Sequence, residues 1–468
     1  MSFNQLLKKS IVTASLSLLL TTLSVSAKTT LVVPPSEQPI LREIQQQVSA
    51  LRLKSDITTL VNFGTRHTLS ETKSTTQGIG AARRWIKAEF ERISQQCGGC
   101  LEVIEQRQTF SGERRIPNPT EVVNIIAIQR GTIAPNRYVI MSGDIDSRVT
   151  DPLDFTSDSP GANDNASGLA GVIETARVLS QYSFDGTIVY AALSGEEQGL
   201  FGGKIMAGIA KEQGWQIEAV INNDMIGNIT GINGISNNTT ARVFSEGIRY
   251  TETAEEAKLR RFTGGEVDSA SRNLARYIDK VADQYIPNLD IMMIYRLDRF
   301  KRGGHHRPFN QVGFPAVRIM ETNEHYDRQH QDLRNEDGRA YGDVLSGVDF
   351  DFTAKLTSLN AVTLASLAWA PAPTMNTELS GAVQPSTTLS WKKTAGKSAQ
   401  NLAGYRVYWR LTTEPTWTNS QYVGNVEQFT LKNIVIDNYF FGVASVAKDG
   451  FESPVVFPGP AGSFGEYD

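Results

Sequence analysis

Several short apolar segments of this chain run directly into acidic residues. The segments lie at 138–141, 187–193, 219–221 and 317–320, and the acidic residues after them are Asp144, Asp146, Glu196, Glu197, Asp224 and Glu321. In open α/β sheets, ligands bind beyond the carboxyl ends of the strands. A group of carboxylates at that edge repels itself unless a cation lies among them. The pattern therefore predicts a hydrolytic metal site.

The metal ligands must be mostly carboxylates, because the whole chain holds only five histidines: His67, His305, His306, His325 and His330. Asp164 lies in the Gly-rich segment 161–168, just before an expected helix. On its own it could equally be a helix N-cap or a turn aspartate. Asp164 supports the prediction of a metal site only together with the other acidic residues.

Glu196 and Glu197 are adjacent at a strand end and are flanked by glycines. They could be solvated loop residues. Because neighbouring side chains diverge, however, one carboxylate can bind a metal while the other faces the attacking water. Metal-assisted hydrolysis needs that division of labour.

Taken in order, these motifs resemble the M28 family of zinc peptidases, which includes bacterial aminopeptidases and, more distantly, glutaminyl cyclases. The resemblance covers about residues 55–370. It rests on segments 142–147 (SGDIDS), 160–168 (PGANDNASG), 194–200 (SGEEQGL) and 223–227 (NDMIG), and on the histidine region 305–330. The C-terminal part resembles a fibronectin type III module through Trp391 and segments 405–409 and 439–443.

The resemblance implies a role for each matching position. The roles are a bridging metal ligand at Asp164, ligands of one metal at Glu197 and His330, ligands of a second metal at Asp144 and Asp224, a general base at Glu196, and a supporting catalytic carboxylate at Asp146. His325 is the alternative to His330. His305 and His306 match a substrate-pocket loop, or else are surface or packing histidines.

One position departs from the family pattern. The first motif normally reads His-x-Asp, and here it reads Asp144-Ile145-Asp146. One metal would then meet only hard oxygen donors, which favours zinc less and tolerates manganese, magnesium or calcium more. The set Asp164, Glu197 and His330 keeps three ligands and an open position, as catalytic zinc prefers. We expect one firm zinc site and a weaker second site.

The elements that position these residues alternate between strand and helix. Strands are expected at 121–128, 138–143, 187–193, 218–223 and 315–320, and helices at 37–62, 78–95, 169–179, 200–213 and 349–370. This alternation predicts an α/β fold with a mostly parallel mixed sheet flanked by helices. Residues 228–300 interrupt it with helices at 253–262 and 268–285, and we expect an insertion that shapes the substrate site.

The chain divides into four predicted regions. Residues 1–27 resemble a signal peptide, with Lys8 and Lys9 before an apolar stretch and a small-residue cleavage site at 25–27. A retained membrane anchor is the alternative, for which the apolar core is short. An N-terminal helical segment spans 28–54, the peptidase-like domain spans 55–370, and a β-sandwich spans 374–468 after the linker at 371–373.

Composition limits the remaining possibilities. The 468 residues are 40% hydrophobic and carry a formal charge of −4, so nothing indicates nucleic-acid binding, which needs a basic face. The two cysteines, Cys97 and Cys100, predict a local disulfide in an exported protein, with a redox motif or half a zinc site as alternatives.

These observations favour a secreted or periplasmic metallopeptidase, an aminopeptidase that acts on peptide or protein substrates. The alternatives are a one-zinc acyl transferase of glutaminyl-cyclase type and a catalytically impaired binding protein. The C-terminal module could attach any of these to a surface, polymer or protein. Glu196 beside Glu197 speaks against an impaired protein, because a scaffold without activity has no physical need for the base.

Overall fold

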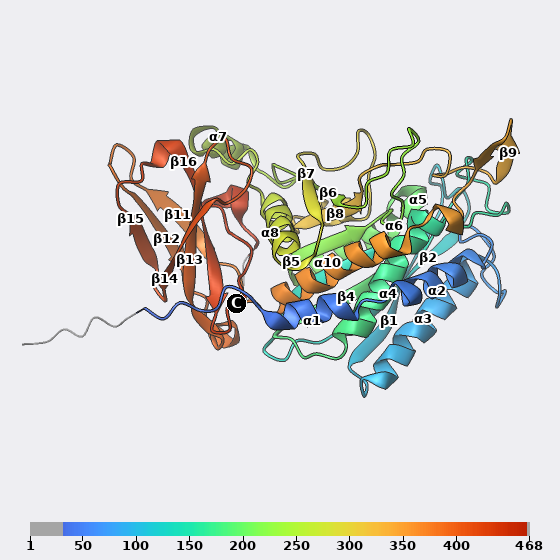
Figure 1. The fold of residues 1–468 in the computed structure, drawn as a ribbon, viewed down its shortest axis with the longest axis horizontal. Helices are drawn as coiled ribbons and strands as arrows, with labels where there is room; N and C mark the ends of the chain where they lie inside the picture. The colour runs from blue at the N-terminus through green and yellow to red at the C-terminus, as the bar shows by residue number, and fades with distance from the viewer. Residues whose placement is uncertain (1–30, 466–468) are drawn as a thin grey trace, which may run out of the picture. The chain divides into compact units, whose positions relative to one another are not determined.

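A computed structural model describes residues 31–465 of the chain (Figure 1). Its centre is an eight-stranded sheet in the order β1-β2-β4-β3-β5-β8-β6-β7. The strands are β1 (Leu101–Phe110), β2 (Thr120–Gln129), β3 (Ala134–Asp144), β4 (Gly186–Leu193), β5 (Gln216–Asn223), β6 (Thr240–Ser245), β7 (Asp290–Ile294) and β8 (Ala316–Glu321). The predicted signal peptide, 1–27, lies outside the described residues.

The middle of the sheet is parallel, and its edges are mixed. Strands β4, β3, β5 and β8 run parallel to one another, whereas β1 with β2, β2 with β4, and β8 with β6 are antiparallel. The predicted α/β class with a mostly parallel mixed sheet is confirmed. Parallel neighbours bring their carboxyl ends to one edge, so the acidic residues that follow β3, β4 and β5 lie close together.

Helices cover both faces of the sheet. They are α1 (Pro39–Gln47), α2 (Ala50–Val61), α3 (Gly78–Gln96), α4 (Gly168–Leu179), α5 (Glu196–Gly199), α6 (Phe201–Glu212), α7 (Ala254–Thr263), α8 (Ala270–Tyr285), α9 (His306–Gln311) and α10 (Phe350–Trp369). Helices α1, α2, α4 and α10 lie together on one face (Figure 1). A hydrophobic core lies on each face of the sheet, and alternate residues of β3 point into one or the other. Val139 and Met141 belong to the larger core, and Tyr138 and Ile140 belong to the core beneath α6 and α9.

Two expectations about elements need correction. The expected helix 37–62 is two helices, because residues 48 and 49 are extended and the Ser49 side chain accepts a hydrogen bond from the Arg52 N–H to start α2. The segment 228–300 is not only an insertion, because its strands β6 and β7 extend the central sheet beyond β8. Strand β1 was also not predicted. These strands lie at or near the sheet edges, where half-exposed sequences carry a weak apolar pattern.

The C-terminal region forms two three-stranded antiparallel sheets, as the predicted β-sandwich requires. One sheet holds β11 (Met375–Ser380), β12 (Thr387–Lys392) and β15 (Gln428–Leu431), and the other holds β13 (Leu402–Leu411), β14 (Asn419–Gly424) and β16 (Tyr439–Ala447). Trp391, Tyr405 and Phe441 fill the core between them. The region also packs on α8, where Lys280 Nζ lies 2.8 Å from Glu452 Oε2.

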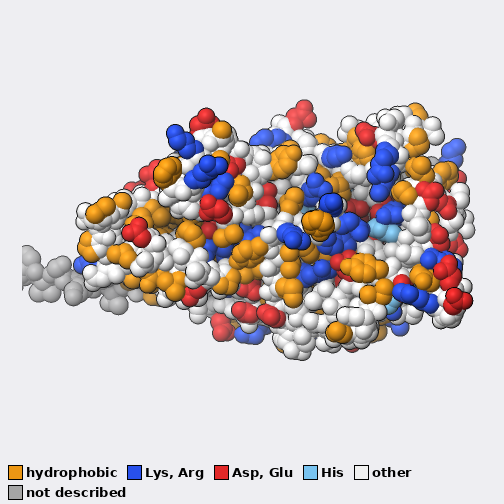
Figure 2. All heavy atoms as spheres, turned by 90° about the horizontal axis from the view of Figure 1, so that it is seen from above, with side chains coloured by type: hydrophobic (Ala, Val, Ile, Leu, Met, Phe, Trp, Pro, Cys, Tyr) orange, Lys and Arg blue, Asp and Glu red, His pale blue; other side chains and the backbone are white. Residues whose placement is uncertain are grey.

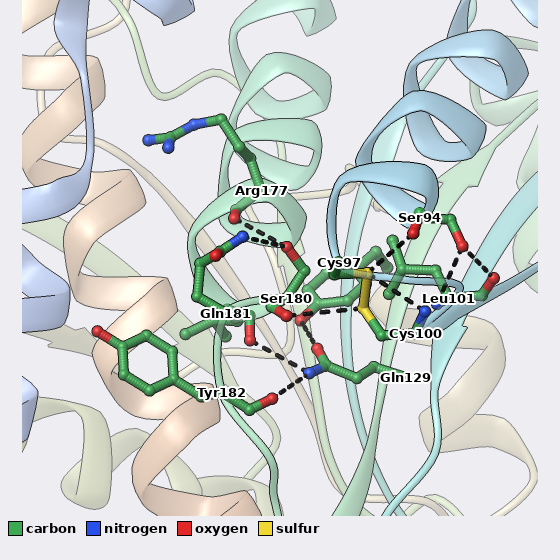
Figure 3. Close-up of a disulfide and its surroundings, with 11 residues drawn as sticks. Ser94, Cys97, Cys100, Leu101, Gln129, Arg177, Ser180, Gln181 and Tyr182 are labelled. Carbon is green, nitrogen blue, oxygen red and sulfur yellow. Dashed lines mark hydrogen bonds between the residues drawn. A yellow bond between two sulfur atoms is a disulfide. The ribbon is translucent and has the colours of Figure 1, made fainter.

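The predicted disulfide joins Cys97 to Cys100, with 5.6 Å between the two Cα atoms (Figure 3). It closes the turn between α3 and β1. The Ser94 hydroxyl, one turn earlier in the helix, donates to the Leu101 carbonyl at 2.8 Å and ties the two elements together. Within residues 31–465, no helix is long and apolar enough to cross a membrane.

Candidate metal centre

Three of the predicted metal ligands meet at the sheet edge. Asp164 lies in the loop before α4, Glu197 lies in α5 directly after β4, and His330 lies in the loop after β8. One ligand atom from each falls within 4.8 Å of the others. His330 Nε2 is 2.9 Å from Asp164 Oδ2 and 2.8 Å from Glu197 Oε1. Three chain segments far apart in sequence therefore converge on one point.

The electrostatics of this group are those of a cation site. Burial alone would lower the pKa of His330, yet Glu197 and Asp164 outweigh it and raise that pKa to about 9. Burial would likewise raise the pKa values of Asp164 and Glu197, yet His330 holds both below their usual range. Without a metal, the two carboxylates therefore share the Nε2–H group of His330 as their common donor.

Arg148 is a fourth member of the group. Its Nε lies 2.7 Å from Glu197 Oε2, and its terminal nitrogen lies 2.6 Å from His330 Nδ1. An arginine can only donate, so Nδ1 accepts in this arrangement and Nε2 carries the ring proton. A metal held by Nε2 would leave the ring proton on Nδ1, so the Arg148 guanidinium would have to turn away from Nδ1 and could keep its contact with Glu197.

Glu196 faces the same open cleft, which measures about 240 Å³ and is lined also by Asp164, Glu197, Asp224 and His330. Its carboxylate has no hydrogen-bond or ion-pair partner among residues 31–465. Burial, followed by repulsion from Glu197 and Asp224, raises the pKa of Glu196 well above its usual value. This carboxylate is therefore free to act on a molecule in the cleft.

Asp146 organises the backbone beneath the two glutamates. Its Oδ1 accepts the Glu196 N–H at 3.2 Å, and its Oδ2 accepts the Glu197 N–H at 3.0 Å and the Thr68 hydroxyl at 3.1 Å. Asp146 thus orients both glutamates through their main chain. It does not point at the metal group itself.

Asp144 is not part of the three-residue group. Its Oδ1 lies 2.5 Å from His305 Nδ1, and its Oδ2 accepts the Asn165 side-chain N–H at 2.8 Å. Burial, then Asp146, raises the pKa of Asp144 well above its usual value, and burial lowers the pKa of His305 to about 4. Both oxygens of Asp144 are thus engaged by neighbouring side chains.

Asp224 has its own cation. The fully buried Arg318, on β8, places a guanidinium nitrogen 2.8 Å from Asp224 Oδ2 and another 3.1 Å from Asp298 Oδ1. Burial raises the pKa of Asp224 to about 8, although Arg318 opposes the rise. The positive charge that a second metal would bring next to Asp224 is therefore already supplied by Arg318.

The remaining candidates have other partners. His306 Nε2 lies 2.8 Å from the Leu297 carbonyl, so His306 holds the loop before α9. Glu321 accepts two hydrogen bonds from the Asn163 side chain, at 3.0 and 2.9 Å, and thereby anchors the loop that carries Asp164. His325, the alternative to His330, is outside the three-residue group.

The three-residue group fits zinc by its chemistry. Carboxylates and imidazoles both bind zinc, and three protein ligands with an open side toward the cleft are the arrangement of catalytic zinc sites. Glu197 is buried, Asp164 and His330 are half-buried, and both carboxylates contact the same imidazole nitrogen. The set Asp144, Asp164 and Asp224 offers no such gathering among the described residues.

Sequence reasoning missed two arginines that decide this geometry. Arg318 interrupts an otherwise apolar strand, and a charged side chain in a buried strand is a usable signal for a buried ion pair. Arg148 directly follows the segment 142–147, but nothing in the sequence shows that it reaches His330, 182 positions later.

Comparison with known proteins was made at the level of sequence and of fold. The sequence model of peptidase family M28 matches residues 124–348. A probable zinc metalloprotease of Leptosphaeria maculans is 42% identical over 429 residues, which cover 92% of this chain and 99% of that protein. A probable zinc metalloprotease of Pyricularia oryzae is 39% identical over 443 residues, which cover 91% and 88%.

Among solved structures, the LapA aminopeptidase of Legionella pneumophila superimposes with a TM-score of 0.51 and 18% identity, covering 77% of each chain. LapB of the same organism gives a TM-score of 0.51 at 17% identity and covers 71% of this chain and 76% of that chain. At this identity the likeness concerns the fold.

Proposed function

This chain belongs to peptidase family M28 and is a zinc metallopeptidase, and on that premise we propose that it is an exported aminopeptidase that uses one zinc ion and Glu196 as general base. The observation that carries the proposal is the convergence of Asp164, Glu197 and His330, with Glu196 on the wall of the same cleft. Those three residues would hold the metal.

Zinc bound there would lower the pKa of a water molecule toward about 7 and polarise the scissile carbonyl. Glu196 takes the proton of the attacking water and passes it to the leaving amine. The free carboxylate of Glu196 suits both transfers, because no protein donor competes for it. Asp146 keeps Glu196 and Glu197 in place through their backbone N–H groups.

The proposal of a single metal rests on Arg318. A divalent cation beside Asp224 would lie close to a guanidinium that is fully buried and has no room to leave. Two like charges at that distance repel strongly where water is excluded. Arg318 therefore replaces a second metal as the counter-charge of Asp224, and the weaker manganese, magnesium or calcium site expected from sequence is not needed.

The size of the cleft supports exopeptidase action. At about 240 Å³ it is smaller than the roughly 300–1,000 Å³ of typical ligand pockets. It suits one or two residues of a substrate rather than a long extended segment. The Gly-flanked Glu196-Glu197 pair also resembles the peptidases of the family more than its cyclases.

Export is supported by the Cys97–Cys100 disulfide, since disulfides persist in oxidising compartments. The two antiparallel sheets around Trp391 support a fibronectin type III-like module, which would attach the enzyme to a surface, polymer or protein.

The experiment is hydrolysis of aminoacyl-anilides by the zinc-loaded protein, with N-terminal glutaminyl peptides assayed in parallel for cyclisation. Anilide hydrolysis that is lost in Glu196→Gln with zinc retained supports the proposal. Cyclisation without hydrolysis would assign the protein to the acyl transferases instead.

A further inference from the structure

We infer that the active-site cleft selects peptides that carry a carboxylate close to the scissile bond, either on an acidic side chain or at the C-terminus. This inference rests on the proposed peptidase function and names its substrate class. Its basis is the cationic lining of the cleft, which consists of Arg115, Arg148, Arg299, Lys301, Arg302 and Arg307.

Most of these cations are not neutralised by the protein. Arg148 pairs with Glu197, and Arg299 pairs with Glu324, each at 2.7 Å. The other four, Arg115, Lys301, Arg302 and Arg307, have no carboxylate within 4.0 Å among the residues that the structure describes. Their charge is therefore available to a molecule that enters the cleft.

Among the carboxylates that line the cleft, only one in the described part of the chain is left to offset this charge. Asp164 and Glu197 face His330, and Asp224 faces Arg318, so Glu196 is the one cleft carboxylate without a cation partner in the described part of the chain. Zinc would add two further positive charges. A free substrate carboxylate would thus meet several unpaired cations, whereas a lysine or arginine side chain would be repelled.

The basic cleft is not a consequence of composition. The chain as a whole carries a formal charge of −4, yet Lys and Arg side chains gather in the middle of the face shown in Figure 2, next to exposed histidine atoms. An acidic protein that concentrates cations around one cleft attracts anionic ligands to that cleft.

The cations also converge from separate parts of the fold. Arg115 lies in the loop between β1 and β2. Arg299, Lys301 and Arg302 lie in the loop between β7 and α9, and Arg307 lies in α9. Lys301 and Arg302 are exposed, whereas Arg115 and Arg307 are half-buried. Arg115 also donates to the Glu197 carbonyl, which places its guanidinium directly beside the metal group. Solvated surface charges would not need such convergence.

The test compares pairs of peptides that differ only in charge. Ala-Glu-amide against Ala-Gln-amide tests a side-chain carboxylate, and Ala-Gln against Ala-Gln-amide tests a C-terminal one. We expect kcat/KM to be at least 10-fold higher for the charged member of one pair or both, chiefly through a lower KM, and the preference to shrink at 0.5 M salt, where charges are screened at about 4–5 Å. A preference in either pair supports the inference and identifies the source. Differences below 2-fold in both pairs overturn it.

A charge-matched pair of variants locates the effect. The double variant Lys301→Gln/Arg307→Gln removes two unpaired cleft cations, and Lys211→Gln/Arg261→Gln removes two exposed cations elsewhere. We expect the cleft variant to lose at least 5-fold of the preference, and the control variant to retain it. Full preference in the cleft variant would contradict the inference. Should Arg307→Gln impair folding, the single variant Lys301→Gln at an exposed side chain gives the same readout.

Failure of the inference and failure of the proposed function are distinguishable. In the Glu196→Gln variant, fluorescence anisotropy measures binding of a fluorescein-labelled Ala-Glu-amide and its Gln counterpart without hydrolysis. Tighter binding of the acidic peptide by an enzyme that cleaves no peptide would uphold the selectivity and refute the function. Cleavage without any preference would do the reverse.

Discussion

Replacement of Glu196 by glutamine tests the chemistry of the site while leaving its shape intact. The substitution keeps the size of the side chain and removes only its charge and its capacity to accept a proton. The main-chain hydrogen bond from Glu196 N–H to Asp146 stays available, and the side chain gives up no partner among the described residues. The fold should therefore be unaffected.

The expected loss follows from the role of a general base, which contributes about 10²–10⁴ in rate. At about 1.36 kcal/mol for each factor of ten, this corresponds to roughly 3–5.5 kcal/mol of transition-state stabilisation. Stability should stay equal or rise, because Glu196 is half-buried and repelled by Glu197 and Asp224. Zinc should remain, since Asp164, Glu197 and His330 are unchanged.

The assay measures kcat on an aminoacyl-anilide, zinc content and the melting temperature in parallel. Glu113→Gln, at an exposed glutamate, is the matched control and should behave like the wild type. A kcat within about 3-fold of the wild type in a zinc-loaded Glu196→Gln protein would refute the assignment of the base.

Three further predictions follow from the buried polar groups. Arg318→Met leaves Asp224 buried without its cation and should lower the free energy of unfolding by about 3–5 kcal/mol, as measured by urea titration. An unchanged urea midpoint would show that Arg318 does not stabilise the buried charge of Asp224. Asp146→Asn should lower kcat/KM by about 10–100-fold and the free energy of unfolding by about 1–3 kcal/mol, because its amide NH2 group faces a backbone N–H that the carboxylate accepted. Wild-type kcat/KM would contradict the positioning role of Asp146. Burial raises the pKa of Glu246 to about 7 from 4.5, so the unfolded chain releases this proton at lower pH than the folded chain and stability falls as pH rises between about 4.5 and 7. Glu246→Gln should therefore reduce the difference between the urea midpoints at pH 5 and pH 8. An equal difference in the variant and the wild type would count against this prediction.

The sequence predicted the parts of the fold that depend on strong local patterns. Helices α3 and α10 and strands β3 to β5 have long apolar runs or clear helical periodicity, and they form close to where they were expected. Strands β6 and β7 were missed because they are short and complete their pairing only against each other and β8, far away in the sequence.

The site was predictable where a motif determines both the residue and its surroundings. Asp164, Glu197 and His330 were assigned from the order of motifs, and the structure brings them together. A second metal was expected at Asp144 and Asp224, and the structure gives these two residues partners that the sequence could not show. Those partners, His305 and Arg318, reach them only through tertiary packing, from positions 161 and 94 residues further along the chain.

The cationic lining of the cleft was likewise visible in the sequence only in part. The basic residues from Arg299 to Arg302, in the loop before α9, are visible in the sequence, but such loops are common on protein surfaces. Only the fold places Arg115 opposite that loop and next to Glu197.

The most direct test of the account is the metal content of protein purified without chelator, measured by mass spectrometry for the wild type, His330→Ala and Asp224→Asn. We expect one zinc per chain in the wild type, loss of that zinc in His330→Ala, and its retention in Asp224→Asn. Two metals per chain, or a full zinc complement in folded His330→Ala, would contradict it.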